Sequence, residues 1–371
     1  MRLVWPSAIA LGLALGCSAP QTPIRVGLAG PLADGVGRPM RLAAEMAVAE
    51  INAGGGIDGR PIELIERDDA GDPDSAVKVA ADLTRLGVVA VIGHVFSGTT
   101  LAAAPVYADA PVPVPVITPS SSAPEVSQAG GHLFRLCPTD LEHGMALATW
   151  IRNGLGLGQG AVLYLNNPYG RGVRQAFVTR FEAMGGTVVE SDPYLGTTPE
   201  VGPYLDRIVA QGTAQFLVIA GNREDATVIL TQARARGMTL PVLGGDGLEG
   251  IEAAGALAEG VFVTAAYLAG LETPENQRFV RSYGARYPEA GAPNQPAAAS
   301  YDAVYLLRDV IRARGATRRG IQEGLAVLGD ELPPHQGVTG VLAFDGRGDL
   351  ARMPVLISVI RNGVVSLVEQ K

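Results

Sequence analysis

Hydroxyl-rich segments follow two neighbouring apolar runs in the first third of the chain. One segment contains Ser97, and the other contains Ser120 and Ser122. Where such a segment joins a parallel strand to a helix, its hydroxyls and backbone N–H groups lie beyond the strand end and favour an anion. Ser122 followed by Glu125 also fits a helix capping box, and Ser97 can cap a helix too. Anion binding and capping therefore remain open for both serines.

Phenol, amide and carboxylate groups follow three further apolar runs in the middle of the chain. They belong to Tyr169, Asn222 and Asp246. Each has a structural explanation, because a tyrosine can pack on the surface, an asparagine can cap a helix, and an aspartate can stabilise a turn. Together with the serines, however, they predict one lobe that binds a carboxylate and another that presents a carboxylate to a cation. Such a cleft would bind a zwitterion.

Short β-branched runs alternate with amphipathic stretches from Ile24 onward, which is typical of βαβ units and a parallel sheet. We expect the first series to have strands at 24–29, 62–67, 89–93 and 114–118 and helices at 40–52, 73–86 and 100–107. The second series has strands at 161–165, 187–190, 216–220 and 242–244 and helices at 172–184, 203–211 and 223–236. The C-terminal part adds helices at 275–286, 297–313 and 318–328 and a hairpin at 354–368 that turns at Asn362-Gly363. The predicted fold class is α/β, with two doubly wound parallel-sheet lobes.

The N-terminus predicts export from the cytoplasm. Arg2 and an apolar stretch precede Ala14-Leu15-Gly16, a small-x-small exit typical of a signal peptide over residues 1–16. Cys17 follows at once, and Ala-Leu-Gly-Cys resembles the lipobox of bacterial lipoproteins, in which that cysteine carries lipid. We therefore expect lipidation at Cys17 and a linker over residues 17–23. An ordinary cleaved signal with an incidental cysteine is the alternative.

Several function classes are disfavoured by composition and motif order. The net charge of −8 argues against a nucleic-acid partner, which basic patches would bind. Gly54-x-Gly56-x-x-Gly59 spells a dinucleotide fingerprint, but it follows a predicted helix and leads into a strand, the reverse of the required order. No metal-ligand spacing connects the four histidines, which are His94, His132, His143 and His335. We expect no catalysis, no cofactor and no metal.

Motifs along the mature chain resemble the leucine/isoleucine/valine-binding family of type I periplasmic binding proteins, which serve ABC importers. They are Val26–Leu32, Ala47–Gly59, Asp68–Pro73, Ile117–Pro119, Tyr169–Gly170 and Phe344–Asp349. The resemblance implies two lobes that close like a hinge, joined by three crossings near 138–142, 264–268 and 338–342. The first lobe would comprise residues 24–139 plus 267–339, and the second lobe residues 140–266 plus 340–371.

The resemblance also implies roles for individual residues. Ser97 and Ser122 match the family's contacts to the ligand carboxylate through hydroxyl and backbone N–H groups. Ser120 matches the residue whose backbone carbonyl takes the ligand ammonium, and Asp246 falls where an acid pairs with that ammonium. Tyr169 matches the aromatic side chain that closes over the ligand from the second lobe.

Two departures from the family leave the ligand side chain open. Asn222 stands where the leucine-type proteins carry an aromatic residue, and the loop 33–39 is shorter than theirs. We expect an amino acid of branched-chain or related type, with an amide, urea or an aromatic acid as the alternative. We also expect a monomer in the periplasm or at the cell surface, with an ABC permease in the inner membrane as partner and membrane contact through the lipid anchor alone. A sensor that signals to a partner is the competing reading of the same fold.

Overall fold

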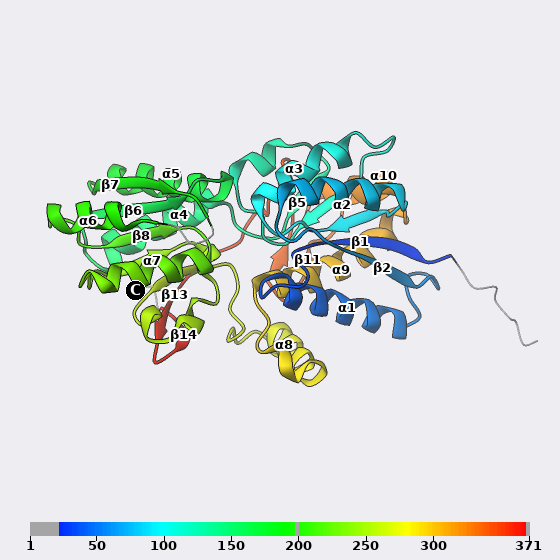
Figure 1. Ribbon diagram of the computed structural model, residues 1–371. Coiled ribbons are helices and arrows are strands. Elements are labelled where there is room, and N and C mark those ends of the chain that lie inside the picture. Colours follow the sequence, from blue (N-terminus) through cyan, green and yellow to red (C-terminus); the bar gives the residue numbers. More distant parts are fainter. Residues whose placement is uncertain (1–21, 197–199, 369–371) are drawn as a thin grey trace, which may run out of the picture.

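The computed structural model describes residues 22–196 and 200–368. The predicted signal peptide and Cys17 lie outside these ranges. Two α/β lobes stand side by side, each with a sheet between helices (Figure 1). None of the described helices is long and apolar enough to cross a membrane. The predicted fold class is confirmed.

The first lobe is built on a five-stranded parallel sheet of order β2-β1-β3-β4-β5. Its strands are β1 (Ile24–Gly30), β2 (Ile62–Asp68), β3 (Ala90–Ile92), β4 (Val116–Thr118) and β5 (Leu133–Arg135). The helices between them are α1 (Gly37–Ala53), α2 (Pro73–Arg85) and α3 (Ser97–Ala108). Helix α2 begins as its sequence predicts, because Asp72 accepts a hydrogen bond from Ser75 N–H and Pro73 takes the first helical position.

Three helices from the C-terminal part complete the first lobe. They are α8 (Pro274–Arg286), α9 (Gln295–Arg314) and α10 (Arg318–Ala326). Leu307 and Ile311 of α9 are buried in one core with Leu28 of β1 and Met40 of α1. The short pair β11 (His335–Gln336) and β12 (Val341–Leu342) follows. Segments far apart in the chain therefore share one hydrophobic core.

The second lobe is built on a seven-stranded sheet of order β14-β13-β10-β9-β8-β6-β7. Five strands are parallel: β6 (Gln159–Leu165), β7 (Thr187–Tyr194), β8 (Leu217–Ala220), β9 (Val242–Gly244) and β10 (Phe262–Ala265). The helices are α4 (Asp140–Thr149), α5 (Pro168–Ala183), α6 (Gly202–Gln211) and α7 (Arg223–Ala235). The antiparallel hairpin β13 (Leu356–Arg361) and β14 (Val364–Leu367) forms one edge, and both turn residues, Asn362 and Gly363, have positive φ as a two-residue hairpin turn requires.

Several short elements were not predicted from the sequence. Besides α4, β5 and β10, they include a π-helical turn, η2 (Trp150–Gly154), and the 3-10 helices η1 (Pro124–Gln128), η3 (Asp246–Leu248), η4 (Ile251–Ala258) and η5 (Pro288–Ala290). Helix α4 starts at a full capping box. The Thr139 hydroxyl accepts from Glu142 N–H at 3.3 Å, and the Glu142 carboxylate accepts from Thr139 N–H at 2.7 Å.

The third crossing between the lobes comes later in the chain than 338–342. Leu342 and Phe344 are buried in the core of the first lobe. Arg135 N–H donates to the Gly348 carbonyl at 2.9 Å, and the Arg135 side chain pairs with Asp349. Residues 340–349 therefore pack on the first lobe instead of the second, and the chain crosses between Asp349 and β13. The other lobe boundaries stay predictions.

Candidate functional site

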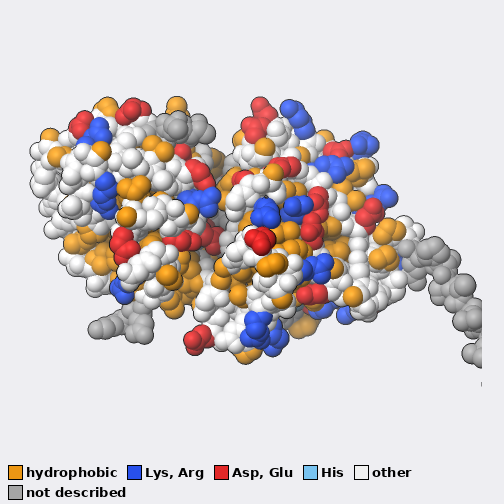
Figure 2. Space-filling model, turned by 60° about the horizontal axis from the view of Figure 1, so that its bottom comes forward, with side chains coloured by type: hydrophobic (Ala, Val, Ile, Leu, Met, Phe, Trp, Pro, Cys, Tyr) orange, Lys and Arg blue, Asp and Glu red, His pale blue; other side chains and the backbone are white. Residues whose placement is uncertain are grey.

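A furrow separates the two lobes in the space-filling view (Figure 2). Side chains bridge the lobes in at least two places. The Glu249 carboxylate of the second lobe accepts a hydrogen bond from Gln295 N–H at the start of α9, with a distance of 2.9 Å. The Arg223 guanidinium of α7 reaches the loop before α1, where a Cβ placed on Gly35 would lie 3.2 Å from it. The lobes are therefore in contact in this structure.

The first lobe contributes neutral polar groups. Ser97 is the first residue of α3 and is only 3% exposed, and its hydroxyl accepts a hydrogen bond from Ala123 N–H at 3.1 Å. Ser122 is 1% exposed, and its hydroxyl makes no hydrogen bond of standard geometry within the described residues. Ser120 is partly exposed. The structure thus brings Ser97 and Ser122 together at the ends of β3 and β4, and ligand contact by the three serines stays a prediction.

Neither buried serine caps a helix. The residue that precedes η1 is Ala123, and no side chain caps that helix, so the capping box predicted for Ser122 and Glu125 is wrong. The chain takes one more residue to enter the helix than the local pattern indicates. Helix α3 likewise begins after Phe96 without a side-chain cap. The capping explanation therefore fails for Ser97 as well.

Buried ionic groups hold these two loops in place from behind. The Arg135 guanidinium donates to the carbonyls of Ser121 and Ala123, both at 3.1 Å, and its Nε lies 2.6 Å from the Asp349 carboxylate. On the other side, His94 Nδ1 lies 2.5 Å from the buried Asp69 carboxylate. The first half of the site is therefore an arrangement of backbone and hydroxyl dipoles, with Arg135 and Asp349 paired behind it.

The second lobe contributes a carboxylate. Tyr169, in the first turn of α5, donates its hydroxyl to Asp246 Oδ1 at 3.0 Å and accepts from Gly247 N–H at 2.8 Å. The Asp246 side chain is 14% exposed. Burial and the charge of Asp246 raise the pKa of the Tyr169 hydroxyl well above its usual value. Tyr169 is thus a neutral, partly buried donor. Residue 245 must be glycine, because a Cβ on Gly245 would lie 2.4 Å from the Tyr169 oxygen.

Asn222 lies near this carboxylate but has a structural task. Its side-chain oxygen accepts from Asp225 N–H at 2.8 Å and caps α7. The preceding Gly221 carbonyl lies 2.5 Å from the place where a Cβ on Gly247 would stand, so the loops after β8 and β9 touch. The capping explanation for Asn222 is confirmed, and a contact with ligand stays a prediction.

Two buried residues of α4 join the site without having been predicted. His143 is fully buried, and its Nε2 lies 3.4 Å from Asp246 Oδ2. Asp140 is fully buried, its backbone N–H donates to the Ser122 carbonyl at 2.9 Å, and neither carboxyl oxygen has a hydrogen bond of standard geometry. Burial raises the pKa of Asp140 well above its usual value, although the Ser122 hydroxyl opposes this.

A sequence signal for both residues was available. Thr139-x-x-Glu142 before an apolar stretch marks a helix start. Asp140 and His143 are three residues apart and therefore share one face of that helix. The pattern would have placed an acid and an imidazole beside the hinge.

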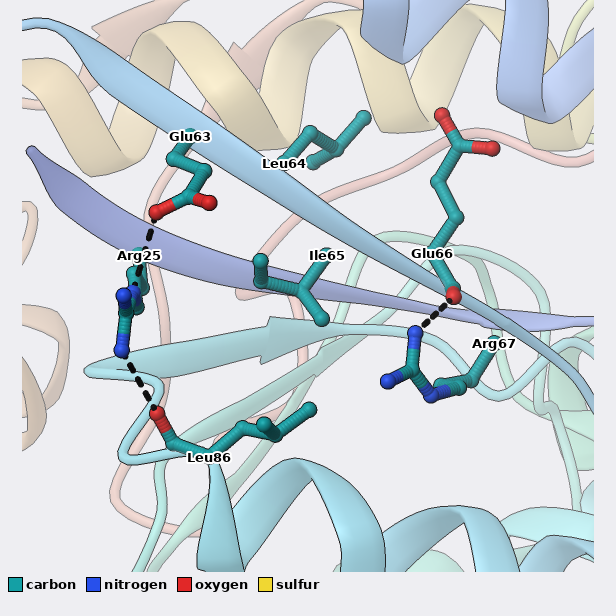
Figure 3. A pocket seen from close by; sticks show the side chains of 7 residues that line it. All are labelled: Arg25, Glu63, Leu64, Ile65, Glu66, Arg67 and Leu86. Carbon is teal, nitrogen blue, oxygen red and sulfur yellow. Dashed lines mark hydrogen bonds and ion pairs between the residues drawn. The ribbon is translucent and has the colours of Figure 1, made fainter.

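One surface depression lies elsewhere, at the outer edge of the first sheet (Figure 3). Its volume is about 270 Å³, and it is lined by Arg25, Glu63, Leu64, Ile65, Glu66, Arg67 and Leu86. Its charges are already engaged, since Arg25 Nε lies 2.9 Å from the Glu63 carboxylate and Arg67 donates to the Glu66 carbonyl at 2.8 Å. We therefore do not regard it as the binding site.

In the described ranges, no group of three or more His, Cys, Asp or Glu side chains could hold a metal ion.

Comparison with known proteins identifies the family of this chain. The family model for periplasmic binding proteins matches residues 23–350. A leucine-, isoleucine-, valine-, threonine- and alanine-binding protein of Pseudomonas aeruginosa is 31% identical over 336 residues, which cover 88% of this chain and 87% of that protein.

Solved structures share the fold. An ABC transporter substrate-binding protein of Desulfitobacterium hafniense, in complex with Leu, is 29% identical with a TM-score of 0.80, covering 94% of this chain and all of that one (100%). A solute-binding protein of an ABC transporter from R. palustris, in complex with benzoate, is 22% identical with a TM-score of 0.82, covering 94% and 96%, and shows the likeness of fold alone. The chain therefore belongs to the periplasmic binding protein family and to its leucine/isoleucine/valine-binding group.

Proposed function

We propose that this protein captures a free α-amino acid, of branched-chain or related type, in the furrow between its lobes and delivers it to the permease of an ABC importer. The observation that carries the proposal is the Asp246 carboxylate. It is partly exposed, its Oδ1 accepts a hydrogen bond from the neutral hydroxyl of Tyr169, and no Lys or Arg nitrogen of the described chain lies within 4.0 Å of it. A carboxylate held in this way can pair with a ligand ammonium.

The opposite lobe supports the carboxylate half of such a ligand. The Ser122 hydroxyl is buried beside the Asp140 carboxyl, and the Ser97 hydroxyl, which accepts from Ala123 N–H, still has its own proton to donate. Ser97 begins the 12-residue helix α3, whose N-terminal backbone N–H groups favour an anion. The distribution of charge between the lobes matches a zwitterion, in agreement with the amino acids that the relatives are named for.

A ligand screen on the purified mature protein tests the proposal. Thermal unfolding is followed with each of the twenty amino acids, and with acetamide, urea and benzoate as ligands that lack an ammonium group. A ligand at about one hundred times its Kd stabilises the folded protein by about 2.7 kcal/mol. We expect one or more aliphatic amino acids to raise the Tm, and isothermal calorimetry then gives their Kd. Stabilisation by benzoate, urea or acetamide alone would refute the amino-acid assignment.

We also propose that Cys17 anchors the protein to the membrane by lipid. Labelled fatty acid should enter the wild type and fail to enter Cys17→Ser, expressed in a bacterium that lipidates proteins. Cys137→Ser is the matched control, because Cys137 is a buried free thiol and its loss should leave labelling unchanged. Equal labelling of wild type and Cys17→Ser would contradict the anchor.

A further inference from the structure

A fully buried imidazole faces the carboxylate that we assign to the ligand ammonium. His143 lies on α4, where the chain enters the second lobe, and its side chain is 0% exposed. Its Nδ1 lies 2.8 Å from the Thr264 hydroxyl oxygen, and its Nε2 lies 3.4 Å from Asp246 Oδ2. Nε2 has no hydrogen-bond partner in the described chain. It is the one basic side chain of the described residues within 4.0 Å of Asp246.

The Thr264 hydroxyl allows both charge states of this imidazole. A hydroxyl can donate to Nδ1 or accept from it. When it donates, the neutral imidazole carries its proton on Nε2, the nitrogen that lies 3.4 Å from Asp246 Oδ2. When a second proton binds at Nδ1, the hydroxyl accepts instead, and the resulting imidazolium cancels the charge of Asp246. One proton therefore changes the net charge of the His143–Asp246 pair from −1 to 0.

The other groups around His143 leave this change in charge uncompensated. Helix α5 contributes the neutral phenol of Tyr169, and β10 contributes Thr264 with no titratable side chain. Strand β13 also packs on α4, and its titratable residue, Arg361, is exposed at the strand end. Burial raises the pKa of Asp140, the first residue of α4, and of the Cys137 thiol just before the helix, so both groups favour their neutral forms. Glu142 is engaged in the capping box at the start of α4.

We propose that His143 is the residue that sets the charge preference of the cation-binding half of the site: as a neutral imidazole it admits an ammonium beside Asp246, and as an imidazolium it excludes one. This inference rests on the proposed amino-acid-binding function. Histidine is the side chain whose charge ordinarily changes between pH 5 and 8. Amino-acid affinity should therefore fall as the pH is lowered through this range, while the amino acid itself stays zwitterionic.

The test measures the Kd of L-leucine by isothermal calorimetry at pH 5, 6, 7 and 8 for the wild type and for His143→Gln, whose amide can still donate to Asp246. Two like charges a few ångströms apart in a protein repel strongly enough to change affinity by about tenfold or more. We expect the wild type to lose at least about tenfold in affinity between pH 8 and pH 5. His143→Gln should lose clearly less, and its remaining loss reflects Glu249, whose pKa burial raises to about 8. His335→Gln is the matched control, because His335 forms a similar pair with Asp309, 2.9 Å away, on the first lobe.

The outcomes separate this inference from the proposed function on which it rests. A merely structural His143 would lower the Tm of His143→Gln and leave the pH profile of the Kd as in the wild type, which would overturn this inference alone. A wild-type Kd that does not change with pH would overturn it too. If none of the twenty amino acids binds the wild type at pH 8, the proposed function itself fails. A clearly flatter profile in His143→Gln, with a wild-type profile in His335→Gln, is the result that we expect.

Discussion

The two lobes bring opposite kinds of polar group to the site that we propose between them. In the first lobe the ionisable side chains near the site are buried and have partners behind it, as in Arg135 with Asp349 and His94 with Asp69. What faces the site is a set of hydroxyls and backbone N–H groups. In the second lobe the charge itself faces the site, because Asp246 is partly exposed and is hydrogen-bonded by an uncharged phenol.

This difference teaches how one cleft can bind a molecule with two charges. Fixed dipoles stabilise an anion without adding a mobile charge to the unliganded site. An ammonium needs a full opposite charge once closure removes its water, because burying an unpaired charge is costly. A single carboxylate in one lobe, facing dipoles in the other, meets both needs. The predictions below test whether the charge of the second lobe and the hydroxyls of the first act in this way.

The largest effect should be on the pH dependence of stability, and it should come from Glu249, which follows Asp246 in the loop after β9. Burial raises its pKa from 4.5 to about 8, against the hydrogen bond from Gln295 N–H. A raised pKa in the folded state means that folding favours the protonated acid, so stability is highest below about 4.5 and is lost as the pH rises through about 8. The loss should reach about 1.4 kcal/mol per pH unit within this interval.

Glu249→Gln should remove this dependence, because the amide keeps an acceptor for Gln295 without the charge. Thermal unfolding from pH 5 to pH 8 should show a falling Tm for the wild type and a nearly constant one for the variant. Parallel curves would mean that Glu249 is charged in the folded protein, and the second lobe would then present two negative charges to the site where we describe one.

Removing the Tyr169 hydroxyl should have the next largest effect. In Tyr169→Phe, Asp246 loses a donor and Gly247 N–H loses its acceptor. Leaving a buried polar group unsatisfied costs about 1–3 kcal/mol, so amino-acid affinity should fall by roughly tenfold, as measured by calorimetry. Tyr164→Phe, at a residue partly buried against the hydrophobic core of the same lobe, is the control. Unchanged affinity in Tyr169→Phe would show that the orientation of Asp246 does not matter.

The two serines of the first lobe should show the smallest effects and should differ from each other. Ser97→Ala and Ser122→Ala should each weaken binding by about 0.5–1.5 kcal/mol, or up to about 3 kcal/mol where the hydroxyl meets a charge. Ser97→Ala should also lower the Tm of the unliganded protein, because Ala123 N–H loses its acceptor. Ser122→Ala should not. Equal affinity in both variants and the wild type would remove the hydroxyls from the site.

Much of the fold could be predicted from local patterns in the sequence. Alternating β-branched and amphipathic stretches indicate the βαβ units, and Asn362-Gly363 fixes the hairpin turn. Strand β5, with three residues, and strand β10, with four, are too short to give a clear pattern. Strand β5 also includes the buried Arg135, a residue type that is usually on the surface. The sequence predicts the third crossing near residues 338–342, earlier than the structure has it. Apolar residues such as Leu342 and Phe344 do not indicate which of the two lobes buries them.

The site was predictable only in part, because a local pattern does not show where a side chain points. Asn222 does cap a helix, whereas Ser122, with an equally good capping pattern, does not. A lone histidine such as His143 gives no sequence signal of a site, and only its contacts with Asp246 and with Thr264, which lies 121 residues further along the chain, show its surroundings. Long-range contacts of this kind depend on the fold and leave no short-range signal.

The central claim, that Asp246 pairs with a ligand ammonium, is tested most directly by changing both partners of that pair. The Kd of L-leucine and of 4-methylpentanoate, which lacks the ammonium group, is measured by calorimetry at one pH for the wild type and for Asp246→Asn. Stranding a buried ammonium costs about 2–5 kcal/mol, so Asp246→Asn should bind L-leucine roughly thirty-fold or more weakly. Its affinity for 4-methylpentanoate and the Tm of the unliganded protein should change little. Retained affinity for L-leucine, or an equal loss for both ligands, would contradict the claim.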